Sequence, residues 1–213
     1  MEIILVAKEA GLAQAFRQAA RGLSGVTVFE GSIFDVQADA YVSPANSFGF
    51  MDGGIDAWYT WRFGDKVQDN VRLAILQYWQ GELPVGAAET VATGDDEVPF
   101  LIAAPTMRVP QILGSDSINP YLAMRATIMS VREGYFKNGP HKGEPISQYI
   151  KTVAVPGLGT GVGKVPFSLA AFQMCEAIRR HLAGRHYLPK SWSEATEDHI
   201  GLLKQSPRNL QKD

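Results

Sequence analysis

The sequence has few of the residues and patterns that mark several large functional classes. Cys175 is its one cysteine, so no internal disulfide can form, and we expect a reducing, cytoplasmic location. The four histidines are scattered and form no His-x-x-x-His pair, so we expect no metal site. No apolar run approaches the ~18 residues of a membrane-spanning helix. The opening MEIILVAKEAGL lacks the basic and long apolar regions of a signal peptide.

An excess of charge of either sign is also missing. The chain has 20 Lys and Arg residues against 22 Asp and Glu residues, which gives a net charge of −2. No bulk field attracts nucleic acid or an anionic membrane, so we expect no general nucleic-acid binding. An anionic ligand would have to be held by local backbone dipoles. The length of 213 residues and the 46% hydrophobic content favour one ordinary globular domain. We expect no cofactor.

Strand-like and helix-like segments alternate along the chain. Short apolar runs predict strands at 2–7, 26–29, 38–42, 88–93, 100–104 and 150–155. Helical spacing of apolar residues predicts helices at 9–23, 55–63, 66–80, 117–136 and 166–182. This alternation predicts a three-layer α/β/α sandwich around a mixed, mostly parallel sheet, formed by residues 1–183. The more polar residues 184–213 predict a helical extension, with Ser191 and Glu194 spaced as a capping box, and then a tail.

Two glycine-containing loops are the places where chemistry is expected. SPANSFGFMDGGID, residues 43–56, and PGLGTGVGKVP, residues 156–166, each follow a strand and precede a helix. In open α/β sheets ligands bind beyond the carboxyl ends of the strands, and exposed backbone amides at a helix start bind anions. The alternative is that both loops use glycine for turn geometry alone. Neither loop is a Walker motif, because Val165 follows Gly163 and Lys164, and AKEAG after the first strand is not a dinucleotide fingerprint.

Together the two loops resemble the macrodomain family. Ser43-Pro44-Ala45-Asn46-Ser47 is similar to the family's Asn-Ala-Ala-Asn-Ser run, and Gly53-Gly54-Ile55-Asp56 to its glycine cluster followed by Val-Asp. Gly159-Thr160-Gly161 with Pro166 five residues later is similar to its later turn. The resemblance covers about residues 26–183. It implies a macrodomain-like fold that binds ADP-ribose or an ADP-ribosylated protein.

The resemblance also implies roles for individual residues. Asn46 would hydrogen-bond the distal ribose, and Asp56 would stand beside the reacting end of that ribose, so these two are the expected catalytic residues. The expected ligand-binding residues are Ser32, Ile33, Asn46, Gly53, Gly54, Ile55, Gly159, Thr160, Gly161, Val162 and Gly163. Ser32 occupies the place of an aspartate that reads adenine in the family, and the nearby Asp35 could substitute for it.

Several of these residues also have a purely structural interpretation. Asn46 could satisfy the backbone of its own turn. Asp56 could simply place a negative charge at a helix start. Large aromatic residues near a turn, here Phe48, Phe50 and Trp58, are expected to be partly buried core rather than ligand contacts.

Three functions follow from the resemblance. The protein could hydrolyse ADP-ribose from a modified side chain or an acyl group, with water oriented by Asp56 and the phosphates. It could be a reader that binds ADP-ribose without chemistry. It could remove the phosphate of ADP-ribose 1″-phosphate, although no histidine falls within either loop to serve as acid, base or nucleophile. Asp56 favours the first of these over the second. An α/β domain that binds another nucleotide, or none, is the remaining alternative.

Overall fold

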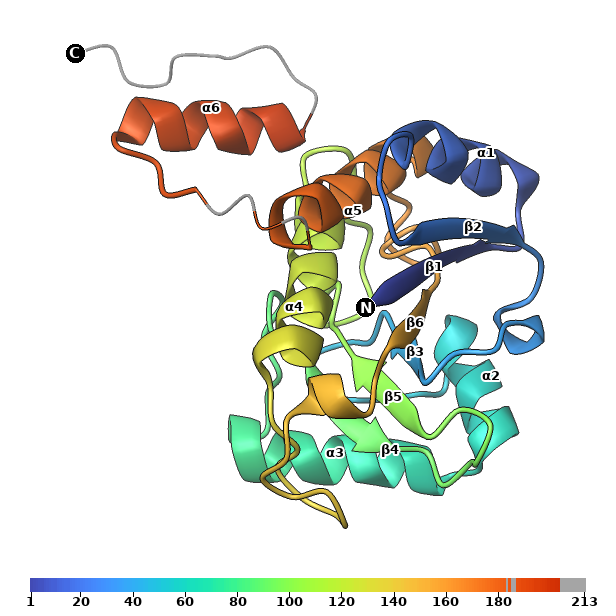
Figure 1. Ribbon diagram of the computed structural model, residues 1–213. Coiled ribbons are helices and arrows are strands. Elements are labelled where there is room, and N and C mark those ends of the chain that lie inside the picture. The colour runs from blue at the N-terminus through green and yellow to red at the C-terminus, as the bar shows by residue number, and fades with distance from the viewer. Residues whose placement is uncertain (183, 185–186, 204–213) are drawn as a thin grey trace.

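Alternating strands and helices build a layered α/β domain (Figure 1). The computed structural model describes residues 1–182, 184 and 187–203. Its strands are β1 (Glu2–Ala7), β2 (Val26–Glu30), β3 (Ala40–Ser43), β4 (Glu89–Ala92), β5 (Phe100–Ala103) and β6 (Thr152–Val155). Its helices are α1 (Ala10–Ala19), α2 (Gly54–Phe63), α3 (Lys66–Trp79), α4 (Asn119–Glu133), α5 (Phe167–His181) and α6 (Trp192–Leu202), with 3-10 turns at Ile33–Asp35 and Ile146–Gln148.

Within the described residues six strands form one sheet in the order β2-β1-β6-β3-β5-β4. All neighbours are parallel except β4, which runs antiparallel to β5 at one edge. The predicted mixed, mostly parallel sheet is therefore confirmed. Because the chain directions agree, β1, β6, β3 and β5 all end at the same edge of the sheet, where ligands bind in open α/β folds.

Helices cover both faces of this sheet, as the alternation of strand residues requires. Leu5 and Val42 pack with Phe16 of α1 and Met174 of α5 on one face, in the cluster that also includes α4. Tyr41 and other strand residues of the opposite face pack against α2 and α3. The three predicted layers are present.

Helix α6 rests on α5 through its carboxyl end. The Arg180 guanidinium pairs with Asp198 at 2.8 Å, and Gln173 Nε2 donates to the Leu202 carbonyl at 3.1 Å. Ser191 caps the helix by accepting the N–H of Glu194, as predicted, but Glu194 accepts from the N–H of Lys190 rather than from that of Ser191. Half of the predicted capping box therefore forms.

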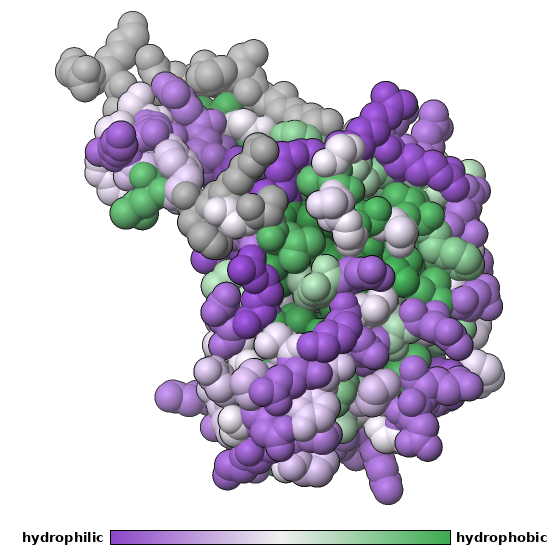
Figure 2. All heavy atoms as spheres, in the orientation of Figure 1, coloured by the Kyte–Doolittle hydropathy of each residue, from purple (hydrophilic) through white to green (hydrophobic). Residues whose placement is uncertain are grey.

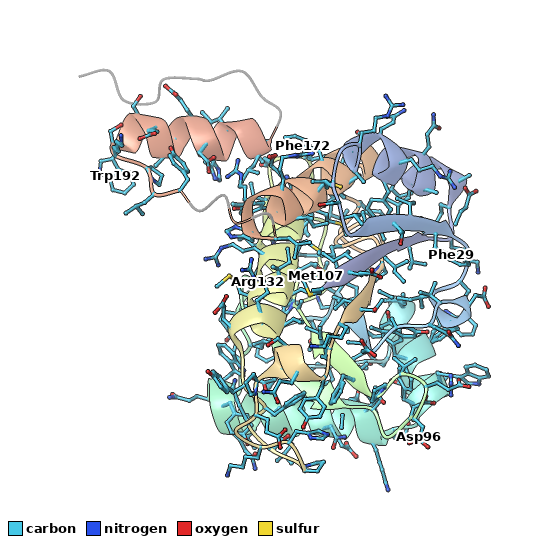
Figure 3. The ribbon with its side chains drawn as sticks, in the orientation of Figure 1. Phe29, Asp96, Met107, Arg132, Phe172 and Trp192 are labelled. Atoms are coloured by element: carbon cyan, nitrogen blue, oxygen red, sulfur yellow. The ribbon has the colours of Figure 1, made fainter. Side chains whose placement is uncertain are left out.

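The start of α6 lies away from the sheet. Trp192 stands at this start, far from the body of the domain (Figure 3), and is 83% exposed. The predicted tail beyond residue 203 lies outside the described residues, and the boundary at 183 stays a prediction.

The surface is mostly polar on the face shown in Figure 2, with apolar side chains gathered where β1, β2 and α1 lie in Figure 1. No helix in the part of the chain that the structure describes combines the length and the apolar character needed to cross a bilayer.

Tyr59 fastens α2 to the sheet. Its side chain is fully buried, and its hydroxyl donates to the carbonyl of Val42 at 3.0 Å. The ring lies against those of Tyr41 and Phe63, with centroids about 6 Å away. Burial raises the pKa of the Tyr59 phenol well above its usual value, so the hydroxyl stays a donor at physiological pH. The start of α2 is positioned by this contact.

Tyr59→Phe should lower the free energy of unfolding by about 1–2 kcal/mol, because it removes one buried hydrogen bond with little change in volume. Urea denaturation monitored by circular dichroism measures this loss. Tyr135→Phe is the matched control, because Tyr135 is 60% exposed, and it should change the value by less than about 0.5 kcal/mol. Equal stability of the two variants would contradict this role for Tyr59.

Candidate functional site

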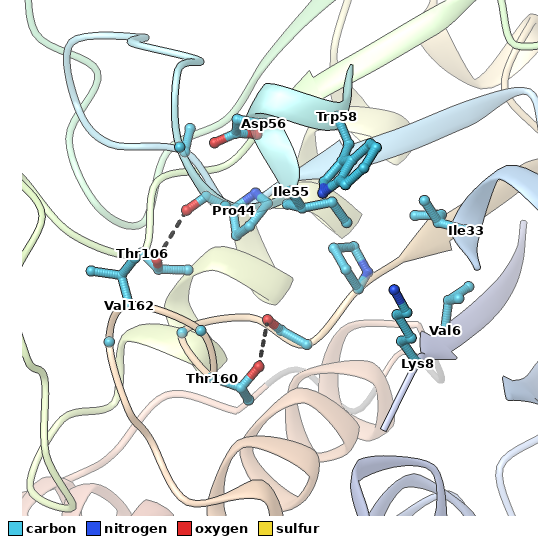
Figure 4. Close-up of a pocket in the computed structure, with 18 of the residues that line it drawn as sticks. Val6, Lys8, Ile33, Pro44, Ile55, Asp56, Trp58, Thr106, Thr160 and Val162 are labelled. Atoms are coloured by element: carbon cyan, nitrogen blue, oxygen red, sulfur yellow. Dashed lines mark hydrogen bonds between the residues drawn. The ribbon is translucent and has the colours of Figure 1, made fainter. Parts of the chain in front are cut away.

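A cavity of about 570 Å³ opens at the edge of the sheet where β1, β3, β5 and β6 end (Figure 4). Every residue that the sequence singled out for ligand binding or catalysis lines it: Ser32, Ile33, Asn46, Gly53, Gly54, Ile55, Asp56, Gly159, Thr160, Gly161, Val162 and Gly163. The two glycine-containing loops face each other across this cavity. The structure thus brings the predicted residues together, while their roles toward a ligand stay predictions.

The loop after β6 is held by its carbonyl groups rather than by its N–H groups. The carbonyls of Gly159, Gly161 and Gly163 accept from Val165, Lys164 and Leu113, at distances of 2.8–3.3 Å. Apart from the turn at residues 158–160, no N–H of residues 157–163 donates to an acceptor among the described residues. Most of the donors of this segment therefore remain for water or a ligand.

Glycine is required in this loop because side chains would collide there. A Cβ at Gly157 would lie 2.5 Å from Thr160 Oγ1 and 2.6 Å from Leu12. A Cβ at Gly163 would lie 2.5 Å from the carbonyl oxygen of Gly159, which itself has a φ of +72°. The turn is thus wound too tightly for side chains at these positions.

The amino end of α2 supplies a second group of donors. The N–H groups of Gly53, Gly54, Ile55 and Asp56 have no acceptor among the described residues, and the first bond of the helix runs from Ala57 N to Gly53 O. A helix start carries a partial positive charge and free N–H groups. Together with the loop after β6, it makes this part of the cavity wall suited to an anion through backbone donors alone.

Asp56 is the most unusual group of the cavity. It is only 7% exposed, and one carboxylate oxygen accepts the Ser43 hydroxyl at 2.6 Å. No described residue donates to the other oxygen. Burial raises the pKa of Asp56 to about 7, against a smaller lowering by the Ser43 hydrogen bond. The carboxyl group therefore exists in both protonation states near neutral pH, as a general acid or base requires.

Asn46 uses its side chain on its own loop. Its Oδ1 accepts the N–H groups of Phe48 and Phe50 at 3.1 and 3.3 Å, and its Nδ2 donates to the Phe50 carbonyl at 2.8 Å. Asn46 therefore holds its own turn, which is the structural role expected for it from the sequence. One Nδ2 hydrogen remains for a ligand, so the predicted ribose contact would be made by a side chain that is already fixed in place.

Two expectations from the sequence are wrong. Phe50 and Trp58 are 49% and 59% exposed and line the cavity, so they are not partly buried core. Asp35 does not line the cavity, so it does not take the place of Ser32 in its wall. Phe48 is half-buried, as expected.

Some lining residues were not predicted. Those missed include Val6 and Ala7 at the end of β1, Lys8, Glu9 and Leu12 that follow it, and Thr106, Met107 and Pro110 after β5. Neither segment carries a glycine motif. The available signal was topological, because β1 and β5 are internal strands whose carboxyl ends must meet the other loops.

Comparisons with known proteins agree with this geometry. The model of the Macro domain family matches residues 42–174. An uncharacterized protein of Aquifex aeolicus is 34% identical over 155 residues, which covers 73% of this chain and 81% of that protein. The chain belongs to the macrodomain family. An uncharacterized protein of Pyrobaculum aerophilum is a more distant relative, 27% identical over 72% of this chain and 74% of its own length.

Solved macrodomains share the fold at low sequence identity. The macrodomain of Mycobacterium tuberculosis DarG superposes with a TM-score of 0.54 at 22% identity, over 71% of this chain and 88% of that one. A mutant Oceanobacillus iheyensis macrodomain solved with ADPR superposes with a TM-score of 0.55 at 16% identity, over 69% of this chain and 72% of that one. The core of this macrodomain therefore has the fold of its family.

The raised pKa of Asp56 predicts a pH-dependent stability change. The folded pKa of about 7 lies above the unfolded value near 3.8, so ionisation costs stability as the pH rises between these values. Asp56→Asn should therefore match wild type near pH 4 and exceed it by about 2–4 kcal/mol in unfolding free energy above pH 7. Chemical denaturation across this range is the measurement. A gain that is independent of pH would show that the carboxyl is not perturbed.

Proposed function

We propose that this macrodomain binds ADP-ribose in its cavity and hydrolyses the bond that links ADP-ribose to a protein side chain or an acyl group. The observation that supports binding is the two sets of unpaired backbone N–H groups, at residues 157–163 and at the start of α2. A diphosphate offers many acceptor oxygens and negative charge. Amide donors from both sides would satisfy it in a protein whose net charge is −2.

The orientation of the ligand follows from the chemistry of the two ends of the cavity. Asp56 and Thr106 make one end of the cavity polar, while Val6, Ile33 and Trp58 make the other end largely apolar, with Lys8 beside Val6 (Figure 4). The distal ribose, with its hydroxyl groups, fits the polar end, and the adenine fits the apolar end. In this proposed orientation the reacting carbon of the distal ribose would lie beside Asp56.

Asp56 supports hydrolysis rather than binding alone. A carboxylate beside a diphosphate repels the ligand, so binding does not need it. With its pKa near 7 it can take a proton from a water molecule that attacks the distal ribose, and then give that proton to the leaving group. The C–O bond to the protein or acyl group breaks, and free ADP-ribose leaves.

Two other functions are less well supported. No histidine in the described part of the chain lines the cavity, which leaves the phosphatase without a nucleophile or acid of that type. A reader without chemistry is favoured by the low exposure of Asp56 and its bond to Ser43, which together could simply join α2 to β3. Separate measurements of binding and turnover decide between reader and hydrolase.

Binding is tested first with a glutamate in the loop after β6. Wild type should bind ADP-ribose with micromolar affinity, about −8 kcal/mol, by calorimetry. Gly161→Glu should abolish binding and keep the fold, because Gly161 has open space and an ordinary φ, so the carboxylate reaches the phosphate region. Gly201→Glu, an equally open glycine on α6, should bind like wild type. Unchanged affinity in Gly161→Glu would place the ligand elsewhere.

Catalysis is tested by removing Asp56. Asp56→Ala should lower the release of ADP-ribose from modified protein by about 10²–10⁴-fold, the usual contribution of a positioned acid–base group. Its affinity for ADP-ribose should stay equal or increase slightly. Asn46→Ala should lose affinity and turnover together, because it opens the loop at 46–50 and removes the ribose contact.

Ser43→Ala tests whether the carboxyl of Asp56 takes part in catalysis, because a purely structural carboxyl would not affect the pH dependence of turnover. The Ser43 hydrogen bond lowers the pKa of Asp56, so its loss should move the pH dependence of turnover to higher pH. If wild type binds ADP-ribose but releases none from Glu-, Asp-, Ser- or Arg-linked substrates, the hydrolase is excluded and the protein is a reader. Full activity in Asp56→Ala would keep the hydrolase and discard this role for Asp56.

A further inference from the structure

The apolar end of the cavity contains an exposed indole ring. Trp58 is 59% exposed although it lines the cavity, and Figure 4 shows it between Ile55 and Ile33. Trp61, one helical turn further along α2, meets it edge-on with ring centroids 6.2 Å apart. A single exposed tryptophan is ordinary, but two neighbouring exposed tryptophans that both line a cavity form an apolar patch of the kind that marks ligand-binding grooves. A flat heterocycle bound at this end would stack on it.

The polar groups at the same end do not dictate one base. Lys8 and Glu9 line the cavity, are exposed, and make no side-chain hydrogen bond or ion pair with the described residues. Lys8 can only donate when charged, Glu9 can only accept when ionised, and the Ser32 hydroxyl can do both. Ser32 Oγ already accepts the N–H of Phe34 at 3.3 Å. An amino or an oxo group on the base would each find a partner here.

Strong discrimination between bases requires a different arrangement. A site rejects the wrong base when a buried polar group is left unpaired by it, because that group then loses its hydrogen bond without regaining water. Lys8 and Glu9 are exposed and Ser32 is half-buried, so all three can return to solvent. Stacking on an aromatic ring contributes about 1–3 kcal/mol per base and depends little on which base is bound.

We infer that Trp58 is the stacking surface for the base of the ligand, and that the cavity accepts nucleoside-diphosphate-ribose ligands with amino or oxo purines almost equally. This inference rests on the proposed binding of ADP-ribose and extends it to a ligand class. Affinity then comes from the diphosphate, the distal ribose and stacking, and the identity of the purine contributes little.

The experiment compares three ligands that differ only in the base: ADP-ribose and its hypoxanthine and guanine analogues. Calorimetric titration is carried out with wild type, Trp58→Ala, Trp58→Phe and Trp192→Ala. Trp192 is the matched control, since it is an exposed tryptophan on α6 that does not line the cavity. Thermal denaturation of each variant shows that the fold is retained.

Wild type should bind the three ligands within fivefold of one another. Trp58→Ala should weaken all three by about 10-fold or more, Trp58→Phe should restore most of the loss, and Trp192→Ala should have no effect. A purine preference of fivefold or more in wild type, or a loss below fivefold in Trp58→Ala, would overturn the inference. If wild type binds ADP-ribose and Gly161→Glu abolishes that binding, either of these two results would contradict the inference on Trp58 and leave the proposed function standing. If wild type binds none of the three, the proposed function falls with it.

Discussion

Backbone donors without acceptors are the constraint on which the rest of the site depends. A loop that keeps most of its N–H groups free cannot be held by them, so its carbonyls and its glycines must hold it. The carbonyls of Gly159, Gly161 and Gly163 close the turn, and Gly157 and Gly163 allow the chain to approach itself more closely than a Cβ permits. The helix start at Gly53 and Gly54 faces this loop only because β3 and β6 are parallel neighbours that end at the same edge. Sheet topology and turn geometry thus act together to line the cavity with backbone donors.

The layered fold was predictable because the spacing of apolar residues along the chain distinguishes strands from helices. Runs such as 100–104 and 150–155 are apolar enough to be strands, and Phe16 and Met174 lie on the inward sides of helices that the spacing predicted. Boundaries moved by a few residues, mainly where a helix was expected to continue, as beyond Ala19. Sequence also brought Asn46, Asp56 and Gly161 into one hypothesis, because each belongs to a loop placed after a strand.

What sequence could not provide were contacts between segments far apart in the chain. The bond from Ser43 to Asp56 joins a strand end to a helix start, and the burial of Asp56 at this junction raises the pKa of its carboxyl. The side-chain amide of Asn46 has both a local and a ligand interpretation in sequence, and only coordinates show that the local one is occupied. Trp58 reads as core by its residue type, yet the helix turns it toward the cavity. Lys8 and Glu9 carry no motif, so only the sheet order reveals them.

The position of α6 has a practical consequence for handling the protein. Helix α5 starts directly after the loop that faces the cavity, and α6 contacts α5 at Gln173 and at Arg180. These residues lie about 9 Å and about 20 Å along the helix from its first residue, Phe167. The start of α6 at Trp192 points away from the body of the domain (Figure 3), so a surface, a fluorophore or a second domain attached there would stand clear of the cavity. Such a tether would leave the mouth of the cavity open to ligands as large as a modified protein.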